Sequence, residues 1–167
     1  MATPTTLPAT FTAGQVLTAA QMNNLRGAFR VLQVVSASYS TGTTSSSSTF
    51  VDTGLTATIT PSSTTSKILV IAVQEGVSKN TGNAANCVDI QLLRGSTVIQ
   101  ATATGVGYTN TDSVLIVGST TAITLDSPAT TSATTYKTQF RNNFNGASVT
   151  IQRSGEASVI ILAEISA

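Results

Sequence analysis

The chain has no histidine and a single cysteine, so the side chains best suited to acid–base catalysis near neutral pH are its seven carboxylates. A glycosidase needs two carboxyl groups in one cleft. Nothing in the spacing of the seven carboxylates suggests that any two of them lie together. The chain also has no tryptophan to form an aromatic platform for a sugar. We therefore expect a protein that is not an enzyme. The seven are Asp52, Glu75, Asp89, Asp112, Asp126, Glu156 and Glu164.

Three short motifs share letters with known sites but are interpreted as turns. Asp52-Thr53-Gly54 has the letters of an aspartic-protease motif, yet it occurs once and follows a short apolar stretch. Asp126-Ser127-Pro128 lacks the oxygen-rich ligand spacing of a calcium loop. Arg94-Gly95 follows two leucines and is interpreted as a turn rather than a cell-adhesion signal.

The lack of histidine also limits nucleophilic and metal chemistry. It excludes a Ser-His-Asp triad, a Cys-His pair and a histidine-ligated metal. Cys87 cannot form a disulfide within the chain, and alone it cannot build a zinc or iron–sulfur site. We interpret Cys87 as a small packed side chain at the start of a strand. The sequence therefore predicts no catalytic, cofactor-binding or metal-binding residue.

The charge of the chain is low and balanced. Charged residues make up 9% of the sequence and the net charge is +1, against roughly 25% charged residues in an ordinary soluble domain. A nucleic-acid-binding protein usually has a basic face, so we expect no nucleic-acid partner. Apolar runs such as Ile68–Val73 are too short for a membrane helix. Because the N-terminus lacks the pattern of a secretory signal, we expect synthesis in the cytoplasm and no membrane insertion.

From Val31 onward, apolar residues recur with a period of two in short stretches separated by Gly, Ser and Asn turns. Nine or ten such stretches predict a mainly β fold, an antiparallel β-sandwich of the jelly-roll type. The clearest alternation lies in Phe50–Thr60 and Thr134–Arg141. The continuous apolar run Lys67–Val77 predicts a strand buried on both faces.

Two segments in the second half of the chain have weaker patterns. Residues Ala101–Asp112 contain two glycines and are interpreted as a loop or a weak strand. Residues Ser113–Gly118 and Thr121–Leu125 predict a hairpin that turns at Ser119-Thr120.

The first thirty residues differ from the rest. Pro4 and Pro8 favour an extended arm over about residues 1–13. Thr18 and Gln21 form a capping box that predicts one short α-helix over residues 18–30. A helix of three turns needs a surface to pack on, which is either its own domain or another protein. We divide the chain into 1–30, an attachment arm and helix, and 31–167, a β-sandwich head. The expected attachment residues are Phe11, Leu17, Met22, Leu25 and Phe29.

Threonine and serine are abundant at the outward positions of the predicted strands. A soluble monomer usually places Lys and Glu there, and charges also protect exposed strand edges. A neutral outer surface favours a subunit that packs against copies of itself or a scaffold. Glu75 lies within the apolar run; it either faces solvent, which we favour, or makes a polar contact at a subunit interface.

Three stretches resemble virion proteins of tailed bacteriophages. Residues 11–23 (FTAGQVLTAAQMN) fit the opening F-x-A-G-x-x-L-T-A-x-x-x-N of many phage tail and fibre proteins. Residues 52–61 (DTGLTATITP) with 66–70 (SKILV) are similar to a recurrent phage-appendage β-domain. Its end resembles Asp126-Ser127-Pro128 with Tyr136, and the closing residues 164–166 (EIS).

The resemblance implies a virion structural protein, localised in the virion and often trimeric, with a β-sandwich head and an N-terminal attachment part. The implied partners are copies of the chain and another tail or capsid protein. A tail-associated appendage and a capsid decoration protein (cement or head-fibre) both remain open. An alternative of another class is a module that binds host-surface glycans through polar loops at Ser78–Asn86 and Ala101–Asp112.

Overall fold

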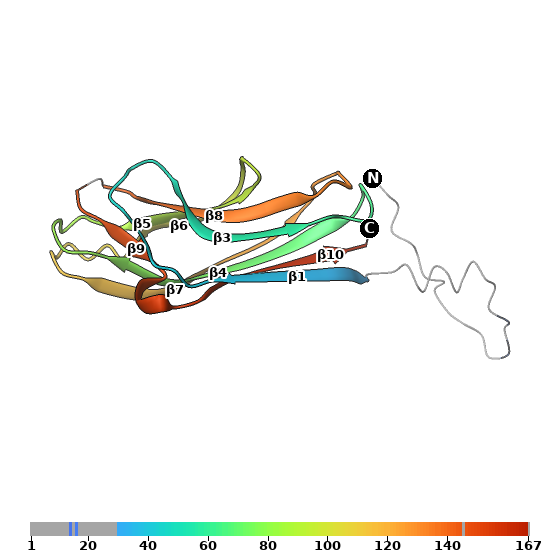
Figure 1. The fold of residues 1–167 in the computed structure, drawn as a ribbon, viewed down its shortest axis with the longest axis horizontal. Helices are drawn as coiled ribbons and strands as arrows, with labels where there is room; N and C mark the ends of the chain where they lie inside the picture. The colour runs from blue at the N-terminus through green and yellow to red at the C-terminus, as the bar shows by residue number, and fades with distance from the viewer. Residues whose placement is uncertain (1–13, 15, 17–29, 145, 167) are drawn as a thin grey trace.

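The computed structural model describes residues 14, 16, 30–144 and 146–166. The described chain is mainly antiparallel β, as predicted, and forms two sheets (Figure 1). The predicted arm over residues 1–13 and nearly all of the predicted helix lie outside these residues. The described elements are β1 (Val31–Tyr39), β2 (Thr43–Ser45), β3 (Val51–Ile59), β4 (Lys67–Lys79), β5 (Val88–Arg94), β6 (Thr97–Val106), β7 (Leu115–Asp126), β8 (Thr134–Asn142), β9 (Val149–Ile151), the 3-10 turn η1 (Arg153–Gly155) and β10 (Ser158–Ile165).

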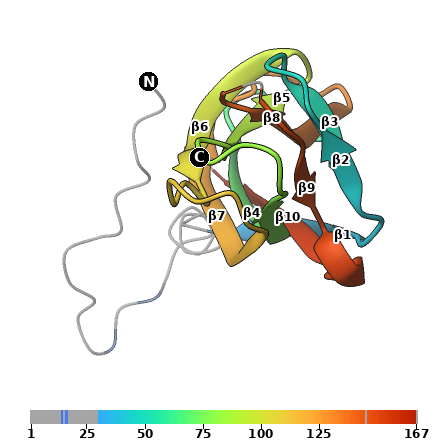
Figure 2. The same ribbon diagram turned by 90° about the vertical axis from the view of Figure 1, so that its left-hand side faces the viewer.

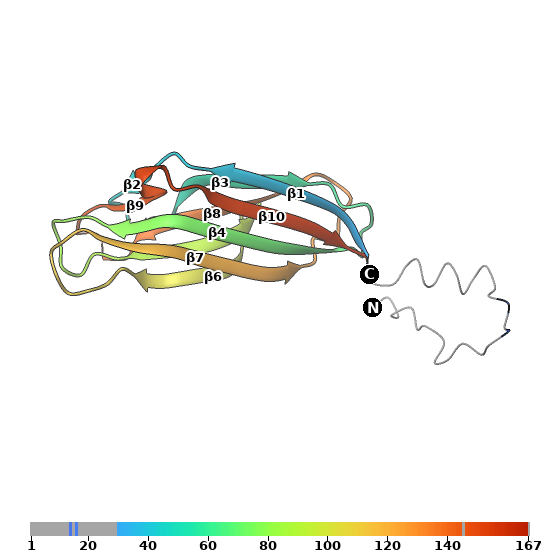
Figure 3. The ribbon, with the colours of Figure 1, turned by 90° about the horizontal axis from the view of Figure 1, so that it is seen from below.

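The first sheet has the strand order β1-β10-β4-β9-β2, with β7 paired to the other edge of β4. The second sheet has the order β3-β8-β5-β6. Figure 2, which looks along the strands, shows the two sheets as separate layers, and Figure 3 shows β1, β10, β4 and β7 side by side. The result is a β-sandwich-like fold.

Alternating side chains give β3 and β8, which are neighbours in the second sheet, one face towards the first sheet and one towards solvent. In β3, Leu55, Ala57 and Ile59 are buried, whereas the threonines between them are exposed. In β8, Tyr136 and Phe140 are fully buried. Both alternations were predicted from the sequence, and both are confirmed, because a strand directs successive side chains to opposite faces.

The core consists of two apolar clusters between the sheets. The larger includes Leu55, Ile68, Leu92, Tyr136 and Leu162 from both sheets. The smaller lies nearer the end of β4 and contains six buried residues: Val77, Val88, Ile90, Phe140, Val149 and Ile151. Burial of apolar surface between the two layers is the main stabilising contribution.

The predicted hairpin at Ser119-Thr120 is wrong. Residues Leu115–Asp126 form one strand, β7, which pairs along β4 from Asp126 opposite Ile68 to Leu115 opposite Lys79. Register shifts between Gln74 and Val77 and between Val77 and Ser78 of β4 accommodate the irregularity, and Gly118, which lies opposite Val77 between the two shifts, has φ 96°. The glycine therefore serves a bulge within a strand instead of a turn.

The segment Ala101–Asp112, for which a loop and a weak strand were both left open, is strand as far as Val106, where β6 ends, and loop after it. One other expectation needs correction. The run Lys67–Val77 is not buried on both faces: Leu69, Ile71 and Val73 on its outer side are only partly buried.

The two ends of the head's chain, at Arg30 and Ser166, lie together at one end of the sandwich. Arg30 accepts a hydrogen bond from the backbone N–H of Ser166 (2.9 Å), and its own N–H donates to the Ser166 hydroxyl (3.0 Å). The connections after β4, β6 and β8 lie at the opposite end (Figure 1). We call this opposite end the loop end.

Candidate functional site

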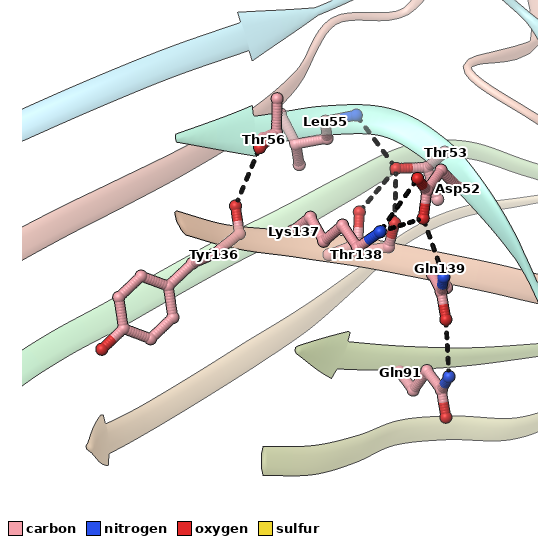
Figure 4. Close-up of polar contacts among 9 residues, drawn as sticks. All are labelled: Asp52, Thr53, Leu55, Thr56, Gln91, Tyr136, Lys137, Thr138 and Gln139. Carbon is pink, nitrogen blue, oxygen red and sulfur yellow. Dashed lines mark hydrogen bonds and ion pairs between the residues drawn. The ribbon is translucent and has the colours of Figure 1, made fainter. Parts of the chain in front are cut away.

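The two outer faces of the sandwich differ in chemistry. On the second sheet, Lys137 of β8 forms an ion pair with Asp52 of β3 (2.9 Å), and Gln139 also donates to Asp52 (2.8 Å). Gln91 of β5 extends the row by donating to Gln139 (2.9 Å; Figure 4). Burial raises the pKa of Asp52, but the hydrogen bonds from Lys137 and Gln139 outweigh it and lower that pKa. The polar side chains in this row hydrogen-bond to one another, and the face they form suits contact with water.

The outer face of the first sheet is apolar instead. Ile123 and Leu125 of β7 are 60% and 58% exposed, and Val34 of β1 is 60% exposed. The register places these side chains in rows across four strands, for example Val34 beside Ala163, Ala163 beside Leu69, and Leu69 beside Leu125. We call this surface the apolar face; it consists of Val34, Leu69, Ile71, Val73, Ile123, Leu125, Val159, Ile161 and Ala163.

Charged groups border the apolar face without entering it. Lys67 lies at one end of the outward row of β4 and donates to the Ser127 hydroxyl (2.6 Å). Glu75 lies at the other end and is partly exposed, as the favoured interpretation of this residue expected. No described residue is packed over the outward side chains of Ile123 and Leu125, which is why they remain exposed.

A buried polar belt crosses between the sheets and separates the two apolar clusters. Thr138 of β8 donates to the side-chain carbonyl of Gln74 in β4 (3.0 Å) and shares a hydrogen bond with Thr53 of β3 (2.6 Å). Gln74 donates in turn to the Ser158 hydroxyl (2.7 Å) of β10, which also accepts from Gln152 (3.1 Å). All five residues are almost fully buried. Because a shifted register would leave these groups unpaired, the belt fixes how the two sheets meet.

Lys79 organises the loop end from inside the protein. Its side chain is completely buried, and its ammonium group donates to Ala84 O (2.9 Å), Thr111 O (2.8 Å) and Thr109 Oγ1 (3.2 Å). It thereby joins the loop after β4 to the loop after β6. Sequence analysis missed this role, because the bulge in β4 changes which of its residues point inward after Gln74.

Two aromatic side chains are exposed on the loops that Lys79 and its neighbours hold. Tyr108 and Phe144 are 52% and 55% exposed, and their ring centroids lie 6.3 Å apart. They come from the connections after β6 and β8. The parts of the two expected glycan-binding segments that are loops, after Lys79 and after Val106, lie at the loop end, and Phe144 adds a third connection that sequence analysis did not single out.

The carboxylates are used by separate structural contacts. Asp126 accepts from Arg94 (2.7 Å) and from the Tyr136 hydroxyl (2.7 Å), and burial together with that hydrogen bond raises the pKa of Tyr136. Asp89 is buried beside Arg141 (2.9 Å). Cys87 is buried as expected, and burial followed by the nearby Asp89 raises its pKa. Within residues 30–144 and 146–166, no three His, Cys, Asp or Glu side chains gather as metal ligands would.

Glu164 is a buried carboxylate that accepts several hydrogen bonds. It is fully buried, and its two oxygens accept from Ser62 N (2.7 Å), the Ser62 hydroxyl (2.6 Å) and Gln33 Nε2 (2.6 Å). Burial would raise its pKa, but the hydrogen bonds from Ser62, Gln33 and Ser66 outweigh burial and lower the pKa to about 2. These contacts join β10 and β1 to the turn after β3.

Acid should therefore destabilise the protein through Glu164. A lowered pKa in the folded state means that the ionised group stabilises the fold above its ordinary pKa of 4.5 and loses that effect as the pH falls towards about 2. We expect the free energy of unfolding, measured by urea denaturation, to fall over this range. In Glu164→Gln the starting stability should be lower and this part of the pH dependence absent. Parallel pH profiles for the two proteins would contradict the assignment.

The five residues expected to mediate attachment, Phe11, Leu17, Met22, Leu25 and Phe29, all lie outside the described residues, so their role stays a prediction. What the structure describes is where their segment joins the head, at Arg30 beside Ser166. The described part of the chain contains no helix with the length and hydropathy to cross a bilayer. No protein-family model matches the sequence, and a search of curated proteins found no significant match.

Proposed function

We propose that the protein is a non-enzymatic structural protein of a tailed-bacteriophage virion. In this proposal a trimeric β-sandwich head, residues 31–167, is attached to the particle by residues 1–30 as a tail-associated appendage. The observation that carries the proposal is that the two ends of the head differ. The chain enters and leaves at one end, beside Arg30 and Ser166, whereas Lys79 holds the longest loops at the other end. A particle-bound appendage needs this separation of attachment from free surface.

We further propose that the head is a jelly roll. The strand order supports this: β1, β10, β4 and β7 lie side by side in one sheet, and β3, β8, β5 and β6 in the other. Each sheet thus combines strands from the beginning, middle and end of the chain. That pattern arises when an antiparallel chain crosses repeatedly between two layers, as in a double Greek key.

Removing residues 1–29 should abolish incorporation into particles while the head stays folded. Both apolar clusters and the polar belt are built from residues beyond Arg30, so we expect the head to fold without the removed segment. The measurements are the melting temperature of the purified protein and its amount in purified particles. Full-length Leu25→Asp is a second variant, which should melt like the wild type and incorporate less. A truncated head found in particles at full occupancy would refute attachment through this segment.

A map of the whole particle would assign the position of the protein. Density for the head at the tail supports the appendage, and density on the capsid surface supports the alternative, a capsid decoration protein. In both positions the head has the same orientation, with Arg30 towards the particle and the loop end outward.

The exposed pair Tyr108 and Phe144 favours a second candidate, a glycan-binding module. Aromatic faces with nearby polar loops suit the stacking of sugar rings. Binding of the isolated protein on a glycan array, lost in Tyr108→Ala and in Phe144→Ala but retained in Thr58→Ala on the second sheet, would support this candidate. The absence of binding on the array would remove it.

A further inference from the structure

We propose that copies of this chain associate through the apolar face, with three heads arranged around an axis parallel to the strands. The occupant of the face is thus another copy of the chain. The inference rests on the proposed trimer and assigns the surface that forms it. It starts from the contrast between the two sheets: the first presents adjacent rows of large aliphatic side chains to solvent, whereas Val98 of β6 is the one exposed large aliphatic side chain on the described strands of the second.

The composition of β4 and β7 supports burial in an assembly. Leu69, Ile71 and Val73 make the outward row of β4 as apolar as its inward row, which is typical of a strand buried on both faces. Ile123 and Leu125 continue these rows at the edge strand β7. The sequence therefore matches an environment that a single copy does not provide.

The apolar face has the size of the core of a protein interface. Four strands about 4.8 Å apart and the five residues of β4 from Leu69 to Val73, at about 3.3 Å each, give a surface of about 19 by 17 Å. That is about 40% of the roughly 800 Å² that each partner buries in a standard interface, so the contact would extend to the polar positions beside these rows. The absence of charge among the residues of the apolar face is typical of the core of such an interface.

The direction of the chain favours a copy as the occupant. Copies arranged around an axis parallel to the strands would all place Arg30 at the same end, so that their N-terminal segments reach one attachment point together. A closed ring also repeats one pair of surfaces and leaves no apolar face unpaired. The second sheet would remain outside, where Asp52 and Lys137 contact water.

The test uses the full-length chain and compares Ile123→Asp with Thr58→Asp. Both positions are exposed strand residues, one on the apolar face and the other on the second sheet. Sedimentation equilibrium should give a trimer for the wild type and for Thr58→Asp. Because Ile123→Asp places an unpaired charge in each contact, association should weaken by about 100-fold or more. Far-UV circular dichroism should be unchanged, since the side chain is exposed in one copy.

If Ile123→Asp fails to fold, Ile123→Ser serves the same comparison with a smaller expected loss. A wild-type monomer at the highest soluble concentration would overturn the inference. So would a monomer that assembles only after removal of residues 1–29, because the face would then be covered by that segment. A trimer that survives Ile123→Asp would refute the face and leave the virion role intact. If Ile123→Asp disrupts the trimer but the wild-type protein is missing from particles, the virion role is refuted and the assignment of the apolar face stands.

Discussion

Gly76→Ala should lower the free energy of unfolding by about 2–5 kcal/mol, the sum of a left-handed backbone for a residue with a side chain and a forced steric overlap. Gly76 has φ 59° within β4. A Cβ atom there would lie 2.3 Å from the backbone nitrogen of Arg153 and 2.8 Å from the carbonyl carbon of Gln152. The chain after β9 crosses β4 at this point, and backbone atoms cannot move aside as a flexible side chain could.

Gly95 offers a matched control for this prediction. Its φ is 58°, and nothing lies within 4 Å of a Cβ atom built on it. Gly95→Ala should therefore cost only the conformational part, about 1–2 kcal/mol. Urea denaturation of both variants separates the two contributions. Equal losses would show that the close approach of Gln152 and Arg153 to β4 does not constrain the fold.

Ser158→Ala should destabilise the protein by about 3 kcal/mol, because it removes the acceptor for several buried donors. The Ser158 hydroxyl accepts from Gln74 Nε2 (2.7 Å), from the backbone N–H of Glu75 (2.9 Å) and from Gln152 Nε2 (3.1 Å). The side chains of Ser158, Gln74 and Gln152 are almost fully buried, whereas the Glu75 donor is a backbone group. Thermal or urea denaturation measures the loss.

The exposed Ser132, whose side chain makes no comparable buried contact, is the control for the same chemical change. Ser132→Ala should alter stability by no more than about 0.5 kcal/mol. A loss for Ser158→Ala as small as that for Ser132→Ala would mean that the belt contributes little to the stability of the fold.

Local alternation made much of the fold predictable. The patterns in Phe50–Thr60 and Thr134–Arg141 predicted β3 and β8 with the correct inward faces, because each pattern depends only on neighbouring residues. The break at Asp126 was also predicted, and β7 ends there. The hairpin at Ser119-Thr120 was predicted wrongly, since polar residues and a glycine are typical both of a turn and of a bulge.

The polar belt and the buried Lys79 could not be predicted in this way. Thr53, Gln74 and Thr138 are far apart in the sequence, and only the pairing of the sheets brings them together. One signal was present: Thr138 occupies the inward position between two aromatic residues, where an apolar side chain would be expected. A polar residue at an inward position of an otherwise regular strand indicates a buried hydrogen-bond partner elsewhere.

The placement of β10 has a consequence for how the protein folds. β10 follows the other described strands in the sequence, yet it lies between β1 and β4 in the first sheet; likewise β8 lies between β3 and β5 in the second. Until these late strands are synthesised, the earlier ones have gaps where their hydrogen-bonding neighbours belong. Such non-local pairing slows folding to the range of milliseconds to seconds. The head should therefore fold in a single cooperative step, completed only after β10 has been synthesised.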